Sequence, residues 1–352
     1  MSSYLPTSRD LECMKRLVLA EGKSADTHYG KTLRGILRYA PETVVAILDS
    51  ERAGETHEGF PVVGTVDDAL AFEPDTATVG VATQGGRFPP AWLEILRACI
   101  EKGLHVENGL HVFLSDDPEL AELARRRGVE LRDLRKPPPD LSTATGANLE
   151  VPAKIVLTVG SDCAIGKMTV SCELDAEARR RGLKSLLVPT GQTGMAIAGW
   201  GIAVDAVVSD FLAGAAEQLV IEGHQRGGEL LWVEGQGAIL HPLYSGVTVG
   251  LLHGSVPHLY VLCHESGRVN MEVDDAKPYP IPPLRELIEL YEAIALPQRP
   301  AKVVAVALNT RELSEEDARA EIAATEAETG LPTDDPVRFG AAKLVDAVLA
   351  GL

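Results

Sequence analysis

The chain of 352 residues is long enough for two domains of ordinary size. Its formal net charge of −18 argues against a general binder of nucleic acid or anionic membranes, because both partners require a basic surface. The five cysteines, Cys13, Cys99, Cys163, Cys172 and Cys263, form no CxxC pair, so we expect a reduced protein without a structural zinc site.

The first part of the chain alternates apolar runs with helical stretches. The runs at 16–22 and 43–49 predict two buried parallel strands, with a helix over 30–40 between them. A further strand is predicted at 76–83. The helix predicted at 89–103 has proline at its start and glycine at its end, as helix-capping preferences require. These strand–helix–strand units predict a doubly wound, Rossmann-like domain, although no GxGxxG motif follows its first strand.

A stretch rich in proline, serine, threonine and glycine interrupts this pattern at residues 138–153, which we interpret as a linker. Apolar strands separated by helical stretches then resume at residue 154 and continue to a terminal helix. The sequence therefore predicts an α/β protein with a Rossmann-like domain at 1–137 and a second doubly wound domain, with a mainly parallel sheet, at 154–352.

Residues 154–182 read as a strand, a glycine-rich loop and a helix, the layout of a P-loop. Such a loop binds phosphate through backbone N–H groups, a lysine and the N-terminus of the following helix. Five residues separate the two glycines, one more than in the common pattern. A plain turn with an exposed lysine is the alternative. The predicted phosphate-binding residues are Gly160, Ser161, Asp162, Cys163, Ala164, Ile165, Gly166, Lys167, Met168 and Thr169.

Met168 follows the lysine, at the position where nucleotide hydrolases carry the hydroxyl that holds magnesium. A thioether is a poor ligand for a hard cation. The hydroxyl of Thr169 lies about 100° further round the helix. We therefore expect the loop to hold a pyrophosphate rather than to cleave one, and we predict no metal ligands.

Four motifs, GSDCAIGKMT, PTGQTG, EGQGA and GLLHGSVPHLYVLCHESGR, occur in this order along the chain. Together with the Rossmann-like first domain, they resemble the bacterial family called "domain of unknown function 1611" over nearly the whole chain. Some members of that family acetylate D-glutamate. The resemblance implies an N-acetyltransferase that uses acetyl-CoA as co-substrate and an acidic amino acid, D-glutamate, as acceptor. The pyrophosphate of CoA has to be held but not cleaved, which agrees with the missing hydroxyl.

The loop spacing and the segment VEGQGAILHPL are also similar to dethiobiotin synthetase, which implies that Glu234 lies near the bound phosphates. One alternative function is therefore an ATP- and magnesium-dependent ligase or kinase, in which Thr169, Asp210 and Glu234 would share the metal. Another is a non-catalytic sensor of nucleotide or CoA. A magnesium-dependent ATPase rate would favour the first, and binding without turnover would favour the second.

Acetyl transfer requires a base, stabilisation of the thioester oxyanion and orientation of the acceptor. Glu234 follows an apolar strand, at the end where ligands bind in parallel sheets, and is a candidate base or a partner of the loop lysine. His253 and His264 are candidate neutral bases, although buried histidines often serve only as structural hydrogen-bond partners.

A dicarboxylate acceptor also requires cationic anchors. We assign Lys31, Arg34 and Arg268 to this role, with Asp210 as a further acidic residue of the substrate site. Solvated surface charge is the alternative for the three cations, and a helix N-cap is the alternative for Asp210.

The sequence shows no apolar leader after a basic start and no apolar run of membrane-spanning length, so we expect a cytoplasmic protein. Its expected partners are small molecules rather than nucleic acid or membranes. The Gly-rich apolar stretches that begin at residues 189 and 246 are candidates for burial between subunits, so we expect a homo-oligomer.

Overall fold

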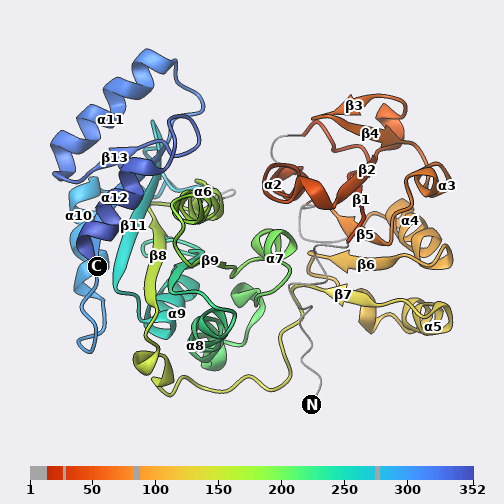
Figure 1. Ribbon diagram of the computed structural model, residues 1–352, viewed down its shortest axis with the longest axis horizontal. Helices are drawn as coiled ribbons and strands as arrows, with labels where there is room; N and C mark the ends of the chain where they lie inside the picture. Colours follow the sequence, from red (N-terminus) through yellow and green to blue (C-terminus); the bar gives the residue numbers. More distant parts are fainter. Residues whose placement is uncertain (1–13, 27–28, 82–87, 274–277) are drawn as a thin grey trace. The chain divides into compact units, whose positions relative to one another are not determined.

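The structure is a computed structural model that describes residues 14–26, 29–81, 88–273 and 278–352. These residues form two compact units (Figure 1). The first unit extends to Pro138 and also includes Gly191–Ala206, whereas the second comprises Pro139–Thr190 and Val207–Leu352. The sequence placed residues 191–206 in the second domain, but their contacts group them with the first unit.

The first unit contains a seven-stranded sheet in the order β3-β4-β2-β1-β5-β6-β7. All of its strand pairs are parallel except β3 with β4. The strands are β1 (Arg16–Leu19), β2 (Val44–Leu48), β3 (Thr56–His57), β4 (Phe60–Val63), β5 (Thr76–Val79), β6 (His105–Asn108) and β7 (Leu131–Asp133). The α-helices are α2 (Lys31–Tyr39), α3 (Val66–Ala69), α4 (Pro90–Glu101), α5 (Pro118–Arg127) and α7 (Gln192–Ala198). The end of the strand predicted at 76–83, like Cys13, lies outside the described residues.

Two buried arginines hold residues 191–206 in the first unit. The guanidinium of Arg16 donates to the carbonyl of Ala196 at 2.8 Å. That of Arg135 donates to the side-chain oxygen of Gln192 at 2.8 Å and pairs with Asp205. Both ends of the segment are therefore fixed by charge-assisted hydrogen bonds, which are stronger than neutral ones.

The second unit contains a six-stranded parallel sheet in the order β13-β12-β11-β8-β10-β9. Its strands are β8 (Lys154–Gly160), β9 (Ser185–Val188), β10 (Leu230–Val233), β11 (Leu259–Glu265), β12 (Lys302–Asn309) and β13 (Thr333–Asp334). Its α-helices are α6 (Lys167–Arg180), α8 (Ser209–Gln225), α9 (Ser245–Ser255), α10 (Leu284–Ala293), α11 (Glu315–Thr329) and α12 (Ala342–Gly351). Both units also contain short 3-10 helices. These are η1 (Pro41–Thr43), η2 (Ser50–Arg52), η3 (Leu70–Phe72), η5 (Leu114–Asp116), η6 (Ala147–Glu150) and η7 (Val204–Ala206).

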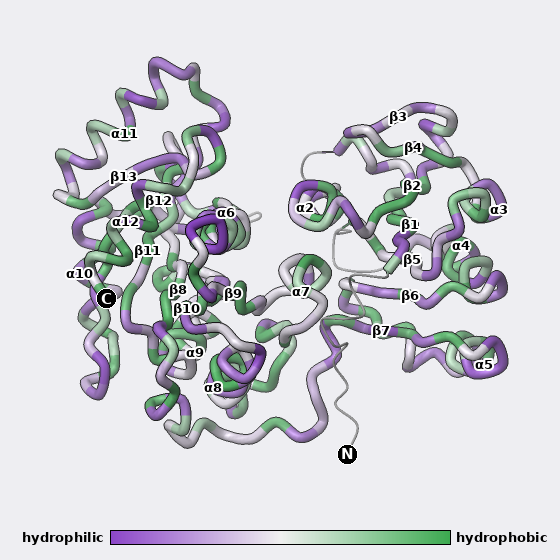
Figure 2. Tube along the Cα trace, in the orientation of Figure 1, coloured by the Kyte–Doolittle hydropathy of each residue, from purple (hydrophilic) through white to green (hydrophobic). Residues whose placement is uncertain are grey.

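Alternating apolar side chains of the second sheet build its core. Trp232 and Val261 pack in one buried cluster with Leu174 of α6 and Leu344 of α12. In Figure 2, hydrophobic residues run along β2 and β8, as expected for parallel strands buried on both faces. The two mainly parallel sheets confirm the predicted fold class. Because β8 pairs in parallel with β10 and β11, the carboxyl ends of all three strands meet at one edge.

Within the described residues, no helix has both the length and the apolar character that crossing a membrane requires. The four described cysteines, Cys99, Cys163, Cys172 and Cys263, are free thiols.

Candidate active site

The glycine-rich loop leaves β8 at Gly160 and enters α6 at Lys167, at the carboxyl edge of the second sheet. Ala164 has a φ of 54° and Gly166 a φ of 106°. This left-handed backbone is strained for alanine, and such strain is concentrated at functional loops. Among the residues that the structure describes, the backbone N–H groups of 164–167 donate to no protein acceptor. Free N–H groups at the start of a helix provide an anion-binding site.

The lysine of the loop is buried and close to an acidic residue. The ammonium group of Lys167 donates to the carbonyl of Asp162 at 2.6 Å. Burial lowers the pKa of Lys167, and the nearby charge of Glu234 opposes that shift. A Cβ on Gly235 would lie 1.8 Å from the carbonyl oxygen of Thr158 and 3.1 Å from the lysine stem. Only glycine therefore allows the segment after β10 to pass this close to the loop.

Glu234 is 3% exposed and makes hydrogen bonds with both carboxylate oxygens. Oε2 accepts from the backbone N–H of Thr190 at 3.0 Å, and Oε1 accepts from the amide of Gln236 at 3.1 Å. The carboxylate is thus fixed by these two hydrogen bonds, and its charge acts on Lys167. Its role as a partner of the loop lysine stays a prediction.

Met168 turns away from the loop. Its Sδ accepts a weak hydrogen bond at 3.6 Å from the thiol of Cys172, one turn further along α6. The side chain at the hydroxyl position thus packs along its own helix, and the absence of a magnesium ligand there stays a prediction.

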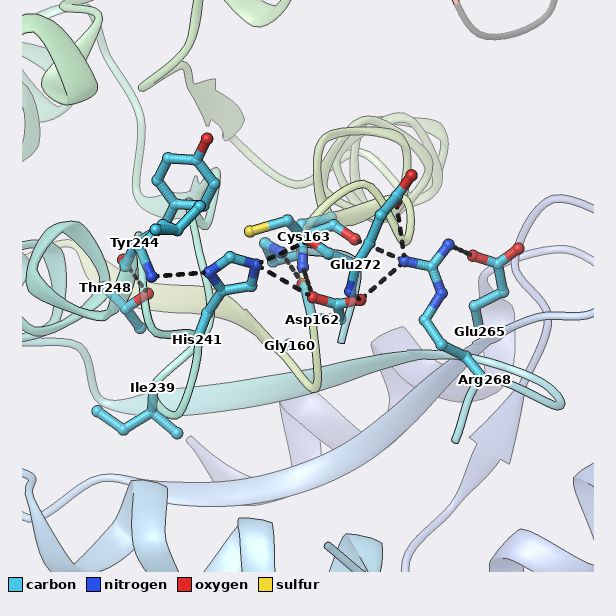
Figure 3. A network of polar contacts seen from close by, with 12 residues as sticks. Gly160, Asp162, Cys163, Ile239, His241, Tyr244, Thr248, Glu265, Arg268 and Glu272 are labelled. Carbon is cyan, nitrogen blue, oxygen red and sulfur yellow. Dashed lines mark hydrogen bonds and ion pairs between the residues drawn. The ribbon is translucent and has the colours of Figure 1, made fainter. Parts of the chain in front are cut away.

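A polar network connects the loop to the segment that follows β11 (Figure 3). The buried carboxylate of Asp162 accepts from Arg268 at 2.8 Å and from the backbone N–H of Glu272 at 2.9 Å. Arg268 also pairs with Glu265 at 2.6 Å and with Glu272 at 3.3 Å. Three carboxylates therefore share one guanidinium, so its charge is already compensated within the network. The guanidinium of Arg268 thus binds residues of the loop, and its role as a substrate anchor stays a prediction.

Asp162, Cys163 and His241 are close enough to resemble a metal site, with potential ligand atoms within 4.8 Å of one another. However, Nδ1 of His241 accepts from the N–H of Leu243 at 3.2 Å, which leaves the ring proton on Nε2. Nε2 then donates to the carbonyl of Glu272 at 3.2 Å. Neither ring nitrogen has a free lone pair, and burial raises the pKa of the Cys163 thiol to about 11. The trio therefore fits a hydrogen-bond network rather than a metal centre.

The side chains of His264 and Tyr291 also contact the loop. The hydroxyl of Ser161 lies 2.8 Å from Nδ1 of His264, at the end of β11. The hydroxyl of Tyr291 donates to the carbonyl of Gly160 at 2.7 Å and accepts from the N–H of Ile239 at 3.1 Å. Sequence analysis missed Tyr291, because a single tyrosine in an amphipathic helix carries no motif.

His253 lies near the amino ends of the strands of the second sheet, opposite the end that holds the loop. Nε2 contacts the carbonyl of Ile294 at 2.9 Å, ahead of β12. Its side chain lines a cavity of about 310 Å³ together with Asn148 and Glu217. The structure therefore does not bring His253, a predicted candidate base, to the loop.

The remaining predicted residues lie on helix surfaces. Asp210 is exposed in the first turn of α8, where its charge favours the helix N-terminus, although the N-cap residue is Val208. Lys31 and Arg34 are exposed on α2 of the first unit.

The fold and the loop define an α/β protein with a Rossmann-like unit and a P-loop unit that has no hydroxyl for magnesium after its lysine. The chain belongs to the DUF1611 family. The family's C-terminal P-loop domain matches residues 142–345, and its N-terminal Rossmann-like domain matches residues 49–137.

Known relatives match over most of the chain. A protein of Tritonibacter scottomollicae named D-glutamate N-acetyltransferase is 37% identical over 94% of this chain and 97% of its own length. A protein of Pseudoalteromonas with the same name is 35% identical over 82% of this chain and 84% of its own length. The crystal structure of a DUF1611 family protein from Anabaena variabilis superposes with a TM-score of 0.88, at 40% identity, and covers 96% of this chain and 99% of that one.

Proposed function

We propose that this protein is a D-glutamate N-acetyltransferase that takes its acetyl group from acetyl-CoA. The observation that carries the proposal is the match to two relatives of that name, which extends over 94% and 82% of the chain. The P-loop adds independent support, because CoA presents a pyrophosphate that has to be bound without being cleaved.

The loop fits the phosphates of acetyl-CoA in charge and in hydrogen bonding. The free N–H groups of residues 164–167 and the ammonium of Lys167 would hold the pyrophosphate. The loop is held in this shape by Asp162, Arg268 and Tyr291. The charges of Asp162 and Arg268 compensate each other, so neither presents an unpaired charge to the ligand. Bound acetyl-CoA supplies the activated thioester, and the chain's own residues bind and orient it.

Of the three predicted catalytic residues, Glu234 and His264 lie beside the loop; we retain Glu234 as the candidate base and His264 as a residue of the same site. His253 is left out because it lies near the amino ends of the strands, away from the loop. Lys31 and Arg34 remain our proposed anchors for the carboxylates of the acceptor, since they are exposed cations on one helix.

The proposal is tested by mixing the purified protein with acetyl-CoA and D-glutamate and measuring the release of free CoA thiol. We expect turnover with D-glutamate that exceeds turnover with L-glutamate and that persists when EDTA removes divalent cations. Lys167→Ala should lower turnover at subsaturating acetyl-CoA by about 10- to 100-fold. The matched control, Lys184→Ala, removes an exposed lysine paired with Glu229 and should leave turnover unchanged. No thiol release, together with ATP hydrolysis that requires magnesium, would overturn the proposal in favour of a ligase or kinase.

A further inference from the structure

The contact between Ser161 and His264 indicates which ring nitrogen of the histidine carries the proton. The side chain of Ser161 is fully buried, and its hydroxyl oxygen lies 2.8 Å from Nδ1 of His264. Among the described residues, this nitrogen is the sole hydrogen-bond partner of that hydroxyl. A buried O–H group without an acceptor is destabilising, so the serine proton has to point at Nδ1.

This direction determines the tautomer of the histidine. If Nδ1 accepts the serine proton, a neutral ring carries its own proton on Nε2. The opposite tautomer would place a proton on Nδ1 and leave the serine O–H buried without an acceptor. In the part of the chain that the structure describes, Nε2 has no protein partner. His264 therefore presents a free N–H donor beside the loop rather than a free lone pair.

The electrostatic surroundings keep this ring neutral. Burial, together with the charge of Arg268, lowers the pKa of His264 to about 4, whereas Asp162 opposes the shift. At neutral pH the ring can donate from Nε2 but cannot accept a proton there without changing its tautomer.

We propose that Ser161 positions His264 as an Nε2–H donor, and that this donor binds a phosphate oxygen of the acyl-CoA rather than removing the proton of the acceptor amine. The inference rests on the proposed function, because it takes CoA as the ligand of the loop. His264 moves in this way from the catalytic candidates to the phosphate-binding residues of the loop, which it contacts through Ser161.

Two amide substitutions separate a donor from a base. Glutamine carries its amide nitrogen near the position of Nε2, whereas asparagine carries it near the position of Nδ1. We expect His264→Gln to bind free CoA within about threefold of the wild type in calorimetry. His264→Asn and His264→Ala should bind it about tenfold more weakly, as expected for the loss of one hydrogen bond to a charged group. The control is His253→Ala, a histidine near the amino ends of the strands, which should leave the affinity unchanged.

Nuclear magnetic resonance of protein with ¹⁵N-labelled histidine side chains reads the tautomer directly. At about pH 8 the wild type should show His264 protonated on Nε2, and Ser161→Ala should convert it to a mixture of both tautomers. A wild-type ring protonated on Nδ1 would overturn the inference. So would a His264→Gln variant that binds CoA normally but loses turnover by more than about a hundredfold, because that pattern identifies a base.

These outcomes are distinct from failure of the proposed function. If the wild-type protein neither binds CoA nor releases thiol, the proposed function fails. If it does both while the glutamine variant binds CoA as weakly as the alanine variant, only the role of His264 fails.

Discussion

Each unit has a turn between its first strand and the helix that follows it, but the two turns differ in how far protein acceptors occupy their N–H groups. In the first unit, Asp49 at the end of β2 fills the turn after β1. It accepts from the N–H of Gly22 at 3.0 Å and from the N–H of Ser24 at 3.1 Å. At the start of α2, the N–H of Leu33 donates to the carbonyl of Gly80 at 2.7 Å. The N–H groups of Gly22, Ser24 and Leu33 in this turn therefore already have protein acceptors.

In the second unit, the loop before α6 keeps its N–H groups free over residues 164–167, within the described part of the chain. Its internal carboxylate, Asp162, accepts from Arg268 and from the N–H of Cys163, but from none of the N–H groups of residues 164–167. The difference teaches that a doubly wound topology by itself does not make a phosphate site. The turn binds an anion only where the protein has not supplied its own.

The strongest test of this comparison removes the lysine of the open turn. Lys167→Ala should weaken acetyl-CoA binding by about 10- to 100-fold, because a charge-assisted hydrogen bond contributes roughly 1.5–3 kcal/mol. Calorimetry measures the loss, with Lys184→Ala as the control. Equal affinities for the two variants would place the phosphates somewhere other than the loop.

Gly235→Ala tests how tightly the open turn is packed. The added Cβ would lie 1.8 Å from the backbone oxygen of Thr158, so we expect a loss of about 1–3 kcal/mol in the free energy of unfolding. Gly246→Ala is the matched control, since a Cβ there meets no atom within 4 Å. Denaturant titration compares the two variants, and a neutral Gly235→Ala would contradict the close approach.

Asp49→Asn tests the closed turn. The amide retains one acceptor but loses the charge that holds the N–H groups of Gly22 and Ser24. We expect the free energy of unfolding to fall by about 1–2 kcal/mol, while acetyl-CoA affinity is unchanged. A weaker affinity for acetyl-CoA in this variant would show that the first unit's turn contributes to ligand binding.

The smallest expected effect is a pH dependence located in the second unit. Burial lowers the pKa of His258 to about 4, from its ordinary value near 6.5. The unfolded chain therefore binds the extra proton first, and stability decreases as pH falls from about 6.5 towards 4. We expect a melting temperature roughly 5 °C lower at pH 5 than at pH 7.5.

His258→Asn is the matched variant for this effect. The Nδ1 atom of His258 accepts from the N–H of Ile155 at 3.0 Å, and the side-chain oxygen of asparagine can replace that acceptor without titrating. The pH dependence of the melting temperature should decrease in this variant. An unchanged slope would assign the dependence to other groups.

The sequence by itself determined the features that depend on residues close together in the chain. The apolar periods predicted β1, β2, α2 and β8 to within a few residues, because strand and helix periods are local properties. The run from Gly160 to Lys167 predicted the loop before α6. The motif order identified the family.

Only the tertiary structure decided which distant side chains meet at the loop. The sheet order β13-β12-β11-β8-β10-β9 places β11 next to β8, so Arg268 reaches Asp162 across 106 positions of the chain. Packing of α10 likewise brings Tyr291 to Gly160. His253 precedes β11 in the chain and therefore lies near the amino ends of the strands, away from the loop. Such contacts follow from the order in which strands pair, and that order is set by the packing of the whole core rather than by any short stretch of sequence.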